Sequence, residues 1–401
     1  MADFCRWENN MKSSSADSEE EKNPEKPPDA YNNPLNKGQF APMKFYFSSS
    51  AEEAKEDFNI GDILRFKINA FIGKGVYGKV AHCINLHTRE NLAIKIMPKY
   101  MSQVCFDELA IHKKLQKLDV NKNNLLKFLE YFSHEKYNCL TFEMLDKNLS
   151  ELLHERALVP LSLSEVRVIT QQMLVALNTL RNMGVAHTDI KPDNIMLVNH
   201  KLQPFKLKLI DFGLARPVSE LECGKIIQPT AYRAPEIILG LPPDAAVDMW
   251  SLGCIVAFLL LADNLEYIIT TGLKDFAEFL DAQAFLSLIK SMLRVDPEKR
   301  ITPGDALEHS FITMDHFGSH IQDNYVKSAR LIIENCQREQ PTAESIFSSG
   351  TAHRAHPRHG RGPFQTRSRK KPLYARLRIE YESVLFLSRR KPDTEKSVTP
   401  R

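Results

Sequence analysis

One short stretch, His187-Thr-Asp-Ile-Lys-Pro-Asp-Asn194, constrains this chain more than any other, because it places a carboxylate, an ammonium and an amide in a single loop. Asp189 can act as a base, Lys191 can neutralise phosphate charge and Asn194 can bind a metal ion at one reacting centre. This combination suits phosphoryl transfer. Proline and asparagine are also ordinary turn residues, so a turn before a strand is the alternative for the stretch taken alone.

The composition excludes several classes of protein. Lys plus Arg (53) nearly balance Asp plus Glu (50), so we expect no direct binding to nucleic acid and no attraction to membranes. The 7 cysteines are scattered without Cys-x-x-Cys spacing, which indicates neither zinc nor a disulfide framework and favours a reducing compartment. No secretory signal is predicted at the N-terminus. The longest apolar run, Cys254 to Ala262, is shorter than the roughly 18 residues that a membrane span needs, and it predicts a buried helix.

The first part of the sequence changes character near Phe66. Residues 1–55 are rich in Ser, Glu, Lys and Pro, and we expect them to be disordered. From Phe66 the alternating pattern predicts a strand that runs into Gly73-Lys-Gly-Val-Tyr-Gly78, and a second strand follows from Val80 to Ile84. Strands on both sides predict a hairpin that covers phosphates, in contrast to the strand-to-helix turn of a dinucleotide fold. A flexible hairpin without a ligand is the alternative.

A lysine and an acidic partner follow the hairpin. The apolar run Leu92-Ala-Ile-Lys95 predicts a short strand that ends in an ammonium, and the helical pattern of residues 106–115 comes next. A partly buried lysine needs a carboxylate partner, and Asp107 and Glu108 both qualify. The helical period of the neighbouring apolar positions turns Glu108 inward, so we prefer Glu108.

The segments before and after the loop of residues 187–194 have patterns that predict a helix and a hairpin. Ser162-Leu-Ser-Glu165 is a capping box, and it predicts the start of an amphipathic helix that continues to Leu180 and leads into the loop. After the loop, Ile195–Val198 and Lys206–Ile210 predict a hairpin that ends at Asp211-Phe-Gly213.

In this order, from Gly73 to Arg300, the motifs resemble the eukaryotic protein kinase family. The closer similarity is to the homeodomain-interacting protein kinase subfamily of the CMGC group. It is carried by Phe142-Glu-Met-Leu145, Pro192–Val198, Ala234–Pro242 and Asp248–Cys254. The resemblance implies an α+β, bilobal fold with a small β-rich N-lobe and a larger, shortened α-helical C-lobe. The implied divisions are a kinase domain at 66–317, made of the N-lobe (66–142), hinge (143–146) and C-lobe (147–317), and a basic, largely disordered tail at 318–401.

The resemblance also implies the activity and the site. The expected reaction is ATP-dependent phosphorylation of protein serine or threonine, with Mg²⁺ as the metal. Asp189 is implied to accept the hydroxyl proton and Lys191 to neutralise the γ-phosphoryl group, while Lys95, held by Glu108, positions the phosphates. The implied nucleotide-binding residues are Ile72, Gly73, Gly75, Gly78, Val80, Ala93, Lys95, Glu143, Leu145 and Met196, and the implied metal ligands are Asn194 and Asp211.

Two further contacts are implied away from the nucleotide. Glu236, in Ala234-Pro-Glu236, is expected to form a buried pair with Arg300. Asp248 is expected to hold the backbone of the opening loop.

Several residues depart from the family pattern. Ile226 stands in place of the activation-loop tyrosine of the subfamily, and Pro229 stands in place of a Ser or Thr that bonds near the catalytic residues. Thr188 and Thr230 each replace an arginine, and the change at Thr230 puts a preference for proline after the phosphoacceptor in doubt. His112 occupies a position that is usually apolar, and we interpret it as a core residue with satisfied hydrogen bonds; a polar group that loosens the active conformation is the alternative.

The chain between Asp248 and Arg300 is much shorter than in the subfamily, and residues 265–280 must serve in place of the missing insert. These departures keep a second hypothesis open, namely a nucleotide-binding scaffold with weak or no turnover. A small-molecule kinase is a weaker third hypothesis, because the Ala234-Pro-Glu236 segment is typical of kinases that act on proteins.

The tail at 318–401 contains short patterns and basic clusters. Val326, Ala329, Ile333 and Cys336 form one short helical pattern, and alternation over residues 373–381 suggests a strand. The basic clusters at 367–371 and 389–391 are candidate nuclear-import signals, and solvated disorder is the alternative. We expect protein substrates, transcription regulators among them by resemblance, a monomeric chain, and a nuclear and/or cytoplasmic location.

Overall fold

An antiparallel sheet carries the glycine-rich hairpin. The computed structural model describes residues 62–63, 65–260 and 276–337. Within these residues a six-stranded sheet has the order β1-β2-β3-β4-β6-β5, with every neighbouring pair antiparallel. Its strands are β1 (Asp62–Ile63), β2 (Phe66–Gly75), β3 (Gly78–Asn85), β4 (Asn91–Pro98), β5 (Phe128–His134) and β6 (Tyr137–Glu143). The predicted strands on both sides of the glycines are confirmed.

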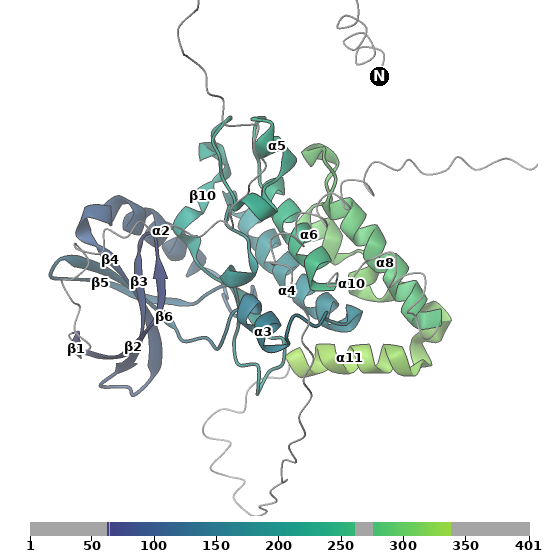
Figure 1. Ribbon diagram of the computed structural model, residues 1–401, viewed down its shortest axis with the longest axis horizontal. Helices are drawn as coiled ribbons and strands as arrows, with labels where there is room; N and C mark the ends of the chain where they lie inside the picture. Colours follow the sequence, from purple (N-terminus) through teal and green to yellow (C-terminus); the bar gives the residue numbers. More distant parts are fainter. Residues whose placement is uncertain (1–61, 64, 261–275, 338–401) are drawn as a thin grey trace, which may run out of the picture. The chain divides into compact units, whose positions relative to one another are not determined.

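Helix α2 (Ser102–Leu115) packs against β4 and β6 of this sheet (Figure 1). It buries Cys105, Leu109, Ile111 and Leu115, so one apolar face of the helix covers one face of the sheet. No side chain caps its N-terminus, where Met101 occupies the N-cap position. The helix is therefore held mainly by side-chain packing.

The second layer of the molecule is built around α4 (Leu163–Asn182). Ser162 and Glu165 form the predicted capping box, in which each side chain accepts a hydrogen bond from the other residue's backbone N–H. The predicted apolar face is confirmed, because Val166, Ile169 and Met173 are fully buried, and burial of each side chain contributes about 1.5–3 kcal/mol.

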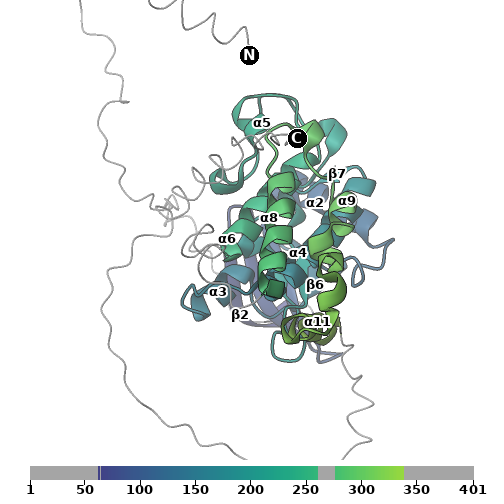
Figure 2. The same ribbon diagram turned by 90° about the vertical axis from the view of Figure 1, so that its right-hand side faces the viewer.

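Five helices pack against α4 (Figures 1 and 2), namely α6 (Ala246–Leu260), α8 (Phe276–Met292), α9 (Pro303–Leu307), α10 (Ser310–Thr313) and α11 (Asn324–Gln337). The helical part also contains α3 (Leu149–Glu155) and α5 (Pro235–Ile238). None of the helices in the described ranges is long and apolar enough to cross a membrane. The combination of a β-rich part and a helical part confirms the predicted α+β, bilobal fold.

Two small sheets position the loops between these layers. β7 (Val185–Ala186) pairs with β10 (Arg216–Pro217), and β8 (Ile195–Leu197) pairs with β9 (Leu207–Leu209). The second pair is the predicted hairpin. The loop of residues 187–194 connects β7 to β8, and the Asp211-Phe-Gly213 segment connects β9 to β10. The two strand pairings therefore bring these segments side by side.

A buried polar cluster joins α4, α8 and α11. Arg167 donates to a carboxylate oxygen of Asp281, and both side chains are completely buried. Asp281 also accepts a hydrogen bond of 2.7 Å from the Tyr325 hydroxyl and lies 3.0 Å from Nε2 of His316, while Arg167 Nε donates to the carbonyl oxygen of Phe311 at 2.6 Å. The pKa of Asp281 lies below its usual range, because these partners outweigh the effect of burial.

Helix α11 is the short helix that the pattern at 326–336 predicts. The helical pattern is confirmed, since Val326, Ala329 and Cys336 are buried. The helix buries these apolar side chains and places Tyr325 against Asp281. The predictions for residues 1–55 and 338–401, and most of the segment 265–280, lie outside the described residues.

Candidate active site

The loop formed by residues 187–194 is held in place by α6. The carboxylate of Asp248 accepts hydrogen bonds from the backbone N–H groups of His187 (2.6 Å) and Thr188 (2.9 Å), as predicted. Burial raises the pKa of Asp248, and these two donors oppose that effect. Thr188 has a φ of 63°, which is rare for a β-branched residue, so the two hydrogen bonds hold a strained backbone in place.

Two predicted catalytic residues, Asp189 and Lys191, meet a predicted metal ligand, Asn194, in this loop. Lys191 Nζ donates to Asp189 Oδ2 at 2.8 Å, and Asn194 Nδ2 donates to the same oxygen at 2.8 Å. Asn194 Nδ2 also donates to the backbone oxygen of Asp189 at 2.8 Å. Both side-chain bonds fall on one carboxylate oxygen of Asp189, which fixes the carboxylate and leaves its other oxygen on the side away from these donors.

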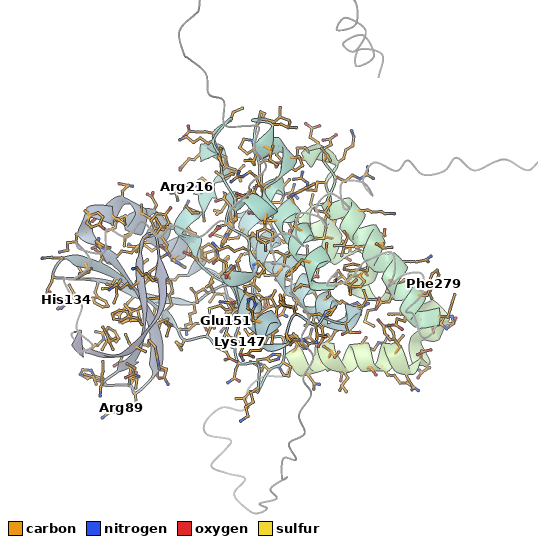
Figure 3. The ribbon with its side chains drawn as sticks, in the orientation of Figure 1. Arg89, His134, Lys147, Glu151, Arg216 and Phe279 are labelled. Carbon is orange, nitrogen blue, oxygen red and sulfur yellow. The ribbon has the colours of Figure 1, made fainter. Side chains whose placement is uncertain are left out.

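A second cluster forms between the sheet and β9. Lys95 Nζ lies 2.9 and 2.8 Å from the two carboxylate oxygens of Glu108 and 2.8 Å from Asp211 Oδ1. Glu108 is 1% exposed, so the predicted inward orientation is confirmed. Asp107, the other candidate, has its carboxylate 3.6 Å from Nη2 of Arg216 in β10. Figure 3 labels Arg216.

The charges in this cluster depend on each other. Burial would lower the pKa of Lys95, but Glu108 and Asp211 outweigh burial and raise it. Burial would likewise raise the pKa of Asp211, but the adjacent ammonium of Lys95 lowers it. Burial raises the pKa of Glu108, and Lys95 opposes this change. A buried ammonium with two acidic partners is suited to holding phosphate oxygens near Asp211.

Gly213 leaves space at this cluster. A Cβ atom there would lie 3.3 Å from Asp211 Oδ1 and 3.4 Å from Lys95 Nζ and from Glu108 Oε2. Asp211 itself has a φ of 60°, in the left-handed region. Glycine at position 213 therefore adds no side chain next to Asp211, Lys95 and Glu108.

Most of the predicted nucleotide-binding residues lie in the six-stranded sheet. Gly73 pairs with Val80 and Val80 pairs with Lys95, so the hairpin leads directly to the lysine. Met196 of β8 forms an isolated bridge with Asn148, which places it next to the segment that follows β6. The residues in the sheet are Ile72, Gly73, Gly75, Gly78, Val80, Ala93, Lys95 and Glu143, while Leu145 follows β6 and Met196 lies in β8.

The backbone conformation and the close surroundings of the last glycine of the hairpin leave no room for a side chain. Gly78 has a φ of 155°, and a Cβ atom there would lie 2.2 Å from the carbonyl oxygen of Ile96. At Gly75 a Cβ atom would meet nothing within 4 Å. We expect Gly78→Ala to strain the hairpin by about 1–3 kcal/mol and to raise the KM for ATP, and Gly75→Ala to change both much less. Thermal unfolding and ATP titration of the two variants check this expectation. Equal effects of Gly78→Ala and Gly75→Ala would contradict it.

Sequence reasoning missed Lys208 in β9. Its Nζ donates to Asn121 Oδ1 at 2.6 Å and to Glu143 Oε1 at 2.5 Å, and its side chain is 3% exposed. Glu143 Oε1 also accepts from the backbone N–H of Lys127 at 2.6 Å. The end of β6 is therefore tied to the strand that precedes Asp211. Alternation in Lys206-Leu-Lys-Leu gives no signal for this contact, because a lysine in such a strand is ordinarily solvated.

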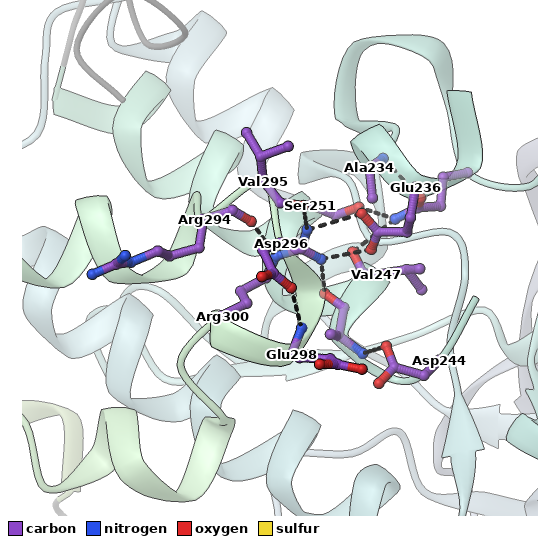
Figure 4. Close-up of polar contacts among 12 residues, drawn as sticks. Ala234, Glu236, Asp244, Val247, Ser251, Arg294, Val295, Asp296, Glu298 and Arg300 are labelled. Atoms are coloured by element: carbon purple, nitrogen blue, oxygen red, sulfur yellow. Dashed lines mark hydrogen bonds and ion pairs between the residues drawn. The ribbon is translucent and has the colours of Figure 1, made fainter. Parts of the chain in front are cut away.

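The Ala234-Pro-Glu236 segment is anchored as predicted (Figure 4). Arg300 donates to both carboxylate oxygens of Glu236, at 2.7 and 2.9 Å, and both side chains are almost completely buried. The amide of Gln228 accepts a hydrogen bond from the backbone N–H of Ala234 and donates to Ser251 Oγ, so α6 also holds this segment.

Of the residues that depart from the family pattern, Ile226, Pro229 and Thr230 lie just before Ala234, and Thr188 lies in the 187–194 loop. Ile226 is 74% exposed, and Pro229 supplies no hydroxyl to Asp189 or Lys191. Thr188 Oγ1 donates to the carbonyl oxygen of Leu214 at 2.8 Å. It therefore contacts the backbone after Asp211, where an arginine would present a charge.

Comparison with known proteins gives a consistent result. The family model described as protein kinase domain matches residues 66–312. Homeodomain-interacting protein kinase 1 of Rattus norvegicus is 33% identical over 72% of this chain and 31% of its own length. Homeodomain-interacting protein kinase 4 of Homo sapiens is 40% identical over 71% of this chain and 62% of its own length. A crystal structure of a kinase domain has a TM-score of 0.55 and 26% identity, and covers 64% of this chain and 98% of that chain.

The matches also show a difference in length. This chain spans about a third of the homeodomain-interacting protein kinase 1 sequences that it matches. The two quoted protein matches extend over 374 and 381 positions, more than the 72% and 71% of the 401-residue chain that they cover. The relatives therefore have residues within the matched region that this chain lacks, in agreement with the short distance between Asp248 and Arg300.

Proposed function

The chain belongs to the protein kinase family and resembles the homeodomain-interacting protein kinases, and from this premise we propose that it transfers the γ-phosphoryl group of ATP to serine or threonine hydroxyls of proteins. One observation carries the proposal. The Lys95–Glu108–Asp211 cluster and the Asp189–Lys191–Asn194 cluster are both assembled with hydrogen-bonding geometry. A protein without catalytic activity would not need both clusters.

The residues at the site are compatible with Mg²⁺ and ATP. Mg²⁺ prefers oxygen ligands and keeps several of its waters, so a carboxylate and an amide oxygen together with phosphates suffice. Asp211 supplies the carboxylate, and Asn194, whose nitrogen is bonded to Asp189, has its amide oxygen available. Gly213 leaves room beside Asp211. When bound, the metal would neutralise charge that develops on the phosphates.

The chain's own residues would divide the remaining work. Asp189 accepts the proton of the attacking hydroxyl, and general-base help of this kind is worth about 10²- to 10⁴-fold in rate. Lys191, whose side chain is 30% exposed, is positioned beside Asp189 to neutralise the transferred group. Lys95 orients the phosphates while Glu108 fixes its position. Positioning and charge stabilisation supply most of the rate in this type of reaction.

The second candidate function is a nucleotide-binding scaffold with weak or no turnover. It is favoured by Pro229, which removes a hydroxyl near the catalytic residues, and by Ile226, which removes a phosphorylation site from the activation segment. It is opposed by the intact geometry of Asp189, Asn194 and Asp211.

One assay separates the two functions. We expect the wild type to transfer radiolabelled phosphate from ATP to a general protein substrate, and Lys95→Met to be at least ~100-fold slower, because the site loses a preorganised charge. Lys67→Met, at an exposed position of β2, is the matched control and should resemble the wild type. Absence of transfer by the wild type favours the scaffold, and full activity of Lys95→Met contradicts the assigned role of Lys95.

The partners and the location are also proposals. The names of the related kinases refer to interaction with homeodomain proteins, and this supports transcription regulators as substrates. The basic clusters at 367–371 and 389–391 support a nuclear as well as a cytoplasmic location. Imaging of the tagged full chain tests the location, and exclusion from both compartments would contradict it. A monomer is expected, and light scattering of the purified chain would show whether it is correct.

A further inference from the structure

His112 is a polar residue in the middle of an aromatic cluster. It lies on α2, one turn after Glu108, and its side chain is completely buried. Its ring stacks on Phe128 at 5.4 Å between centroids and contacts the rings of Phe142 at 5.0 Å and Phe212 at 5.2 Å. Phe212 is the residue after Asp211. His112 is therefore part of the packing that joins α2 to the metal-binding segment.

Neither ring nitrogen of His112 has a hydrogen-bond partner in this arrangement. The nearest acidic atom, Glu108 Oε1, lies 4.0 Å from Nε2, which is too far for a hydrogen bond. Burial lowers the pKa of His112 to about 3, with the charge of Lys95 acting in the same direction and that of Asp211 opposing it. The ring is accordingly neutral, with one unpaired donor and one unpaired acceptor.

An unpaired polar group disfavours the state in which it is buried. If α2 moves away from Phe212, a ring nitrogen can reach water, so the penalty applies only while the helix is in its inward position. The same inward position brings Glu108 to Lys95. No side chain caps the N-terminus of α2, and the Arg216–Asp107 contact at 3.6 Å is about one-third exposed on both sides and adds little.

Resting on the proposed function, we propose that His112 is a positioning residue that weakens the inward position of α2, so that Glu108 holds Lys95 in only a fraction of the molecules. An apolar side chain at the same place would carry no such penalty. His112 thereby sets how much of the protein is ready for phosphoryl transfer.

The test uses two substitutions of the same shape. Leucine and asparagine have isosteric side chains and differ in polarity, so His112→Leu removes the unpaired polar group and His112→Asn keeps one. The deciding measurement is amide hydrogen exchange of residues 102–115 in the full chain, which reports opening of α2 without any need for activity. We expect exchange in His112→Leu to be about fivefold slower than in the wild type, or slower still. His112→Asn should exchange at least as fast as the wild type.

Phosphate transfer is the second measurement. At saturating ATP the rates should follow the same order, with His112→Leu fastest and His112→Asn slowest. The proposal is overturned if His112→Leu exchanges as fast as the wild type, or if both variants shift exchange in the same direction, because the effect would then come from shape. If the exchange order holds and none of the proteins transfers phosphate, the proposed function fails while the effect of His112 on α2 stands.

Discussion

Asp189→Asn should lower the rate of phosphate transfer by about 10²- to 10⁴-fold while leaving the KM for ATP and the thermal stability close to those of the wild type. Asparagine has the same shape as aspartate, so the hydrogen bonds from Lys191 and Asn194 find an oxygen in the same place. It cannot accept the proton of the attacking hydroxyl. The loss therefore falls on the chemical step.

Asp193→Asn is the matched control for this variant. It makes the same change of charge in the same loop, but Asp193 is exposed, in contrast to the buried carboxylate of Asp189. Steady-state transfer of radiolabelled phosphate, with circular dichroism to verify folding, measures both variants. An Asp189→Asn protein with more than a tenth of the wild-type rate would refute the role of Asp189 as the base.

The features that sequence predicted well are those with a local cause. The capping box of Ser162 and Glu165 is written within four consecutive residues, and it begins α4 where expected. The inward orientation of Glu108 follows from a single helical period. The Glu236–Arg300 pair spans a long distance in the chain, and it was predicted only because the ordered motifs resemble a family in which that pair occurs.

The contacts that sequence missed have no local signal. Lys208 pairs with Glu143, and Arg167 pairs with Asp281, between elements far apart in the chain. A charged residue within an otherwise amphipathic helix or strand ordinarily indicates a solvated face, so burial of these charges was not expected. Only the packing of the elements shows that each has a partner. The hydrogen bond from Tyr325 of α11 to Asp281 of α8 likewise joins elements that are far apart in the chain.

Arg300→Met should reduce the free energy of unfolding by about 3–5 kcal/mol, because it leaves the carboxylate of Glu236 buried without a compensating charge. The loss would include the hydrogen bonds from Arg300 to the carbonyl oxygens of Ala246 and Arg294, which tie α6 to the segment after α8. The guanidinium also lies 5.2 Å from the ring of Trp250, so its replacement removes a stacking contact.

A double variant separates the charge from the packing. Glu236→Gln combined with Arg300→Met removes both charges, so it should recover part of the stability lost in Arg300→Met, since the main cost of the single change is an isolated buried carboxylate. Lys299→Met is the matched control, because the neighbouring Lys299 pairs with Asp296 at the surface and its loss should have little effect. Urea unfolding measures all three proteins. A double variant that is less stable than Arg300→Met, by more than the cost of losing a neutral hydrogen bond, would contradict this explanation. The buried charge would then not be the cause of the loss, and the pair would stabilise the Ala234-Pro-Glu236 segment through its geometry.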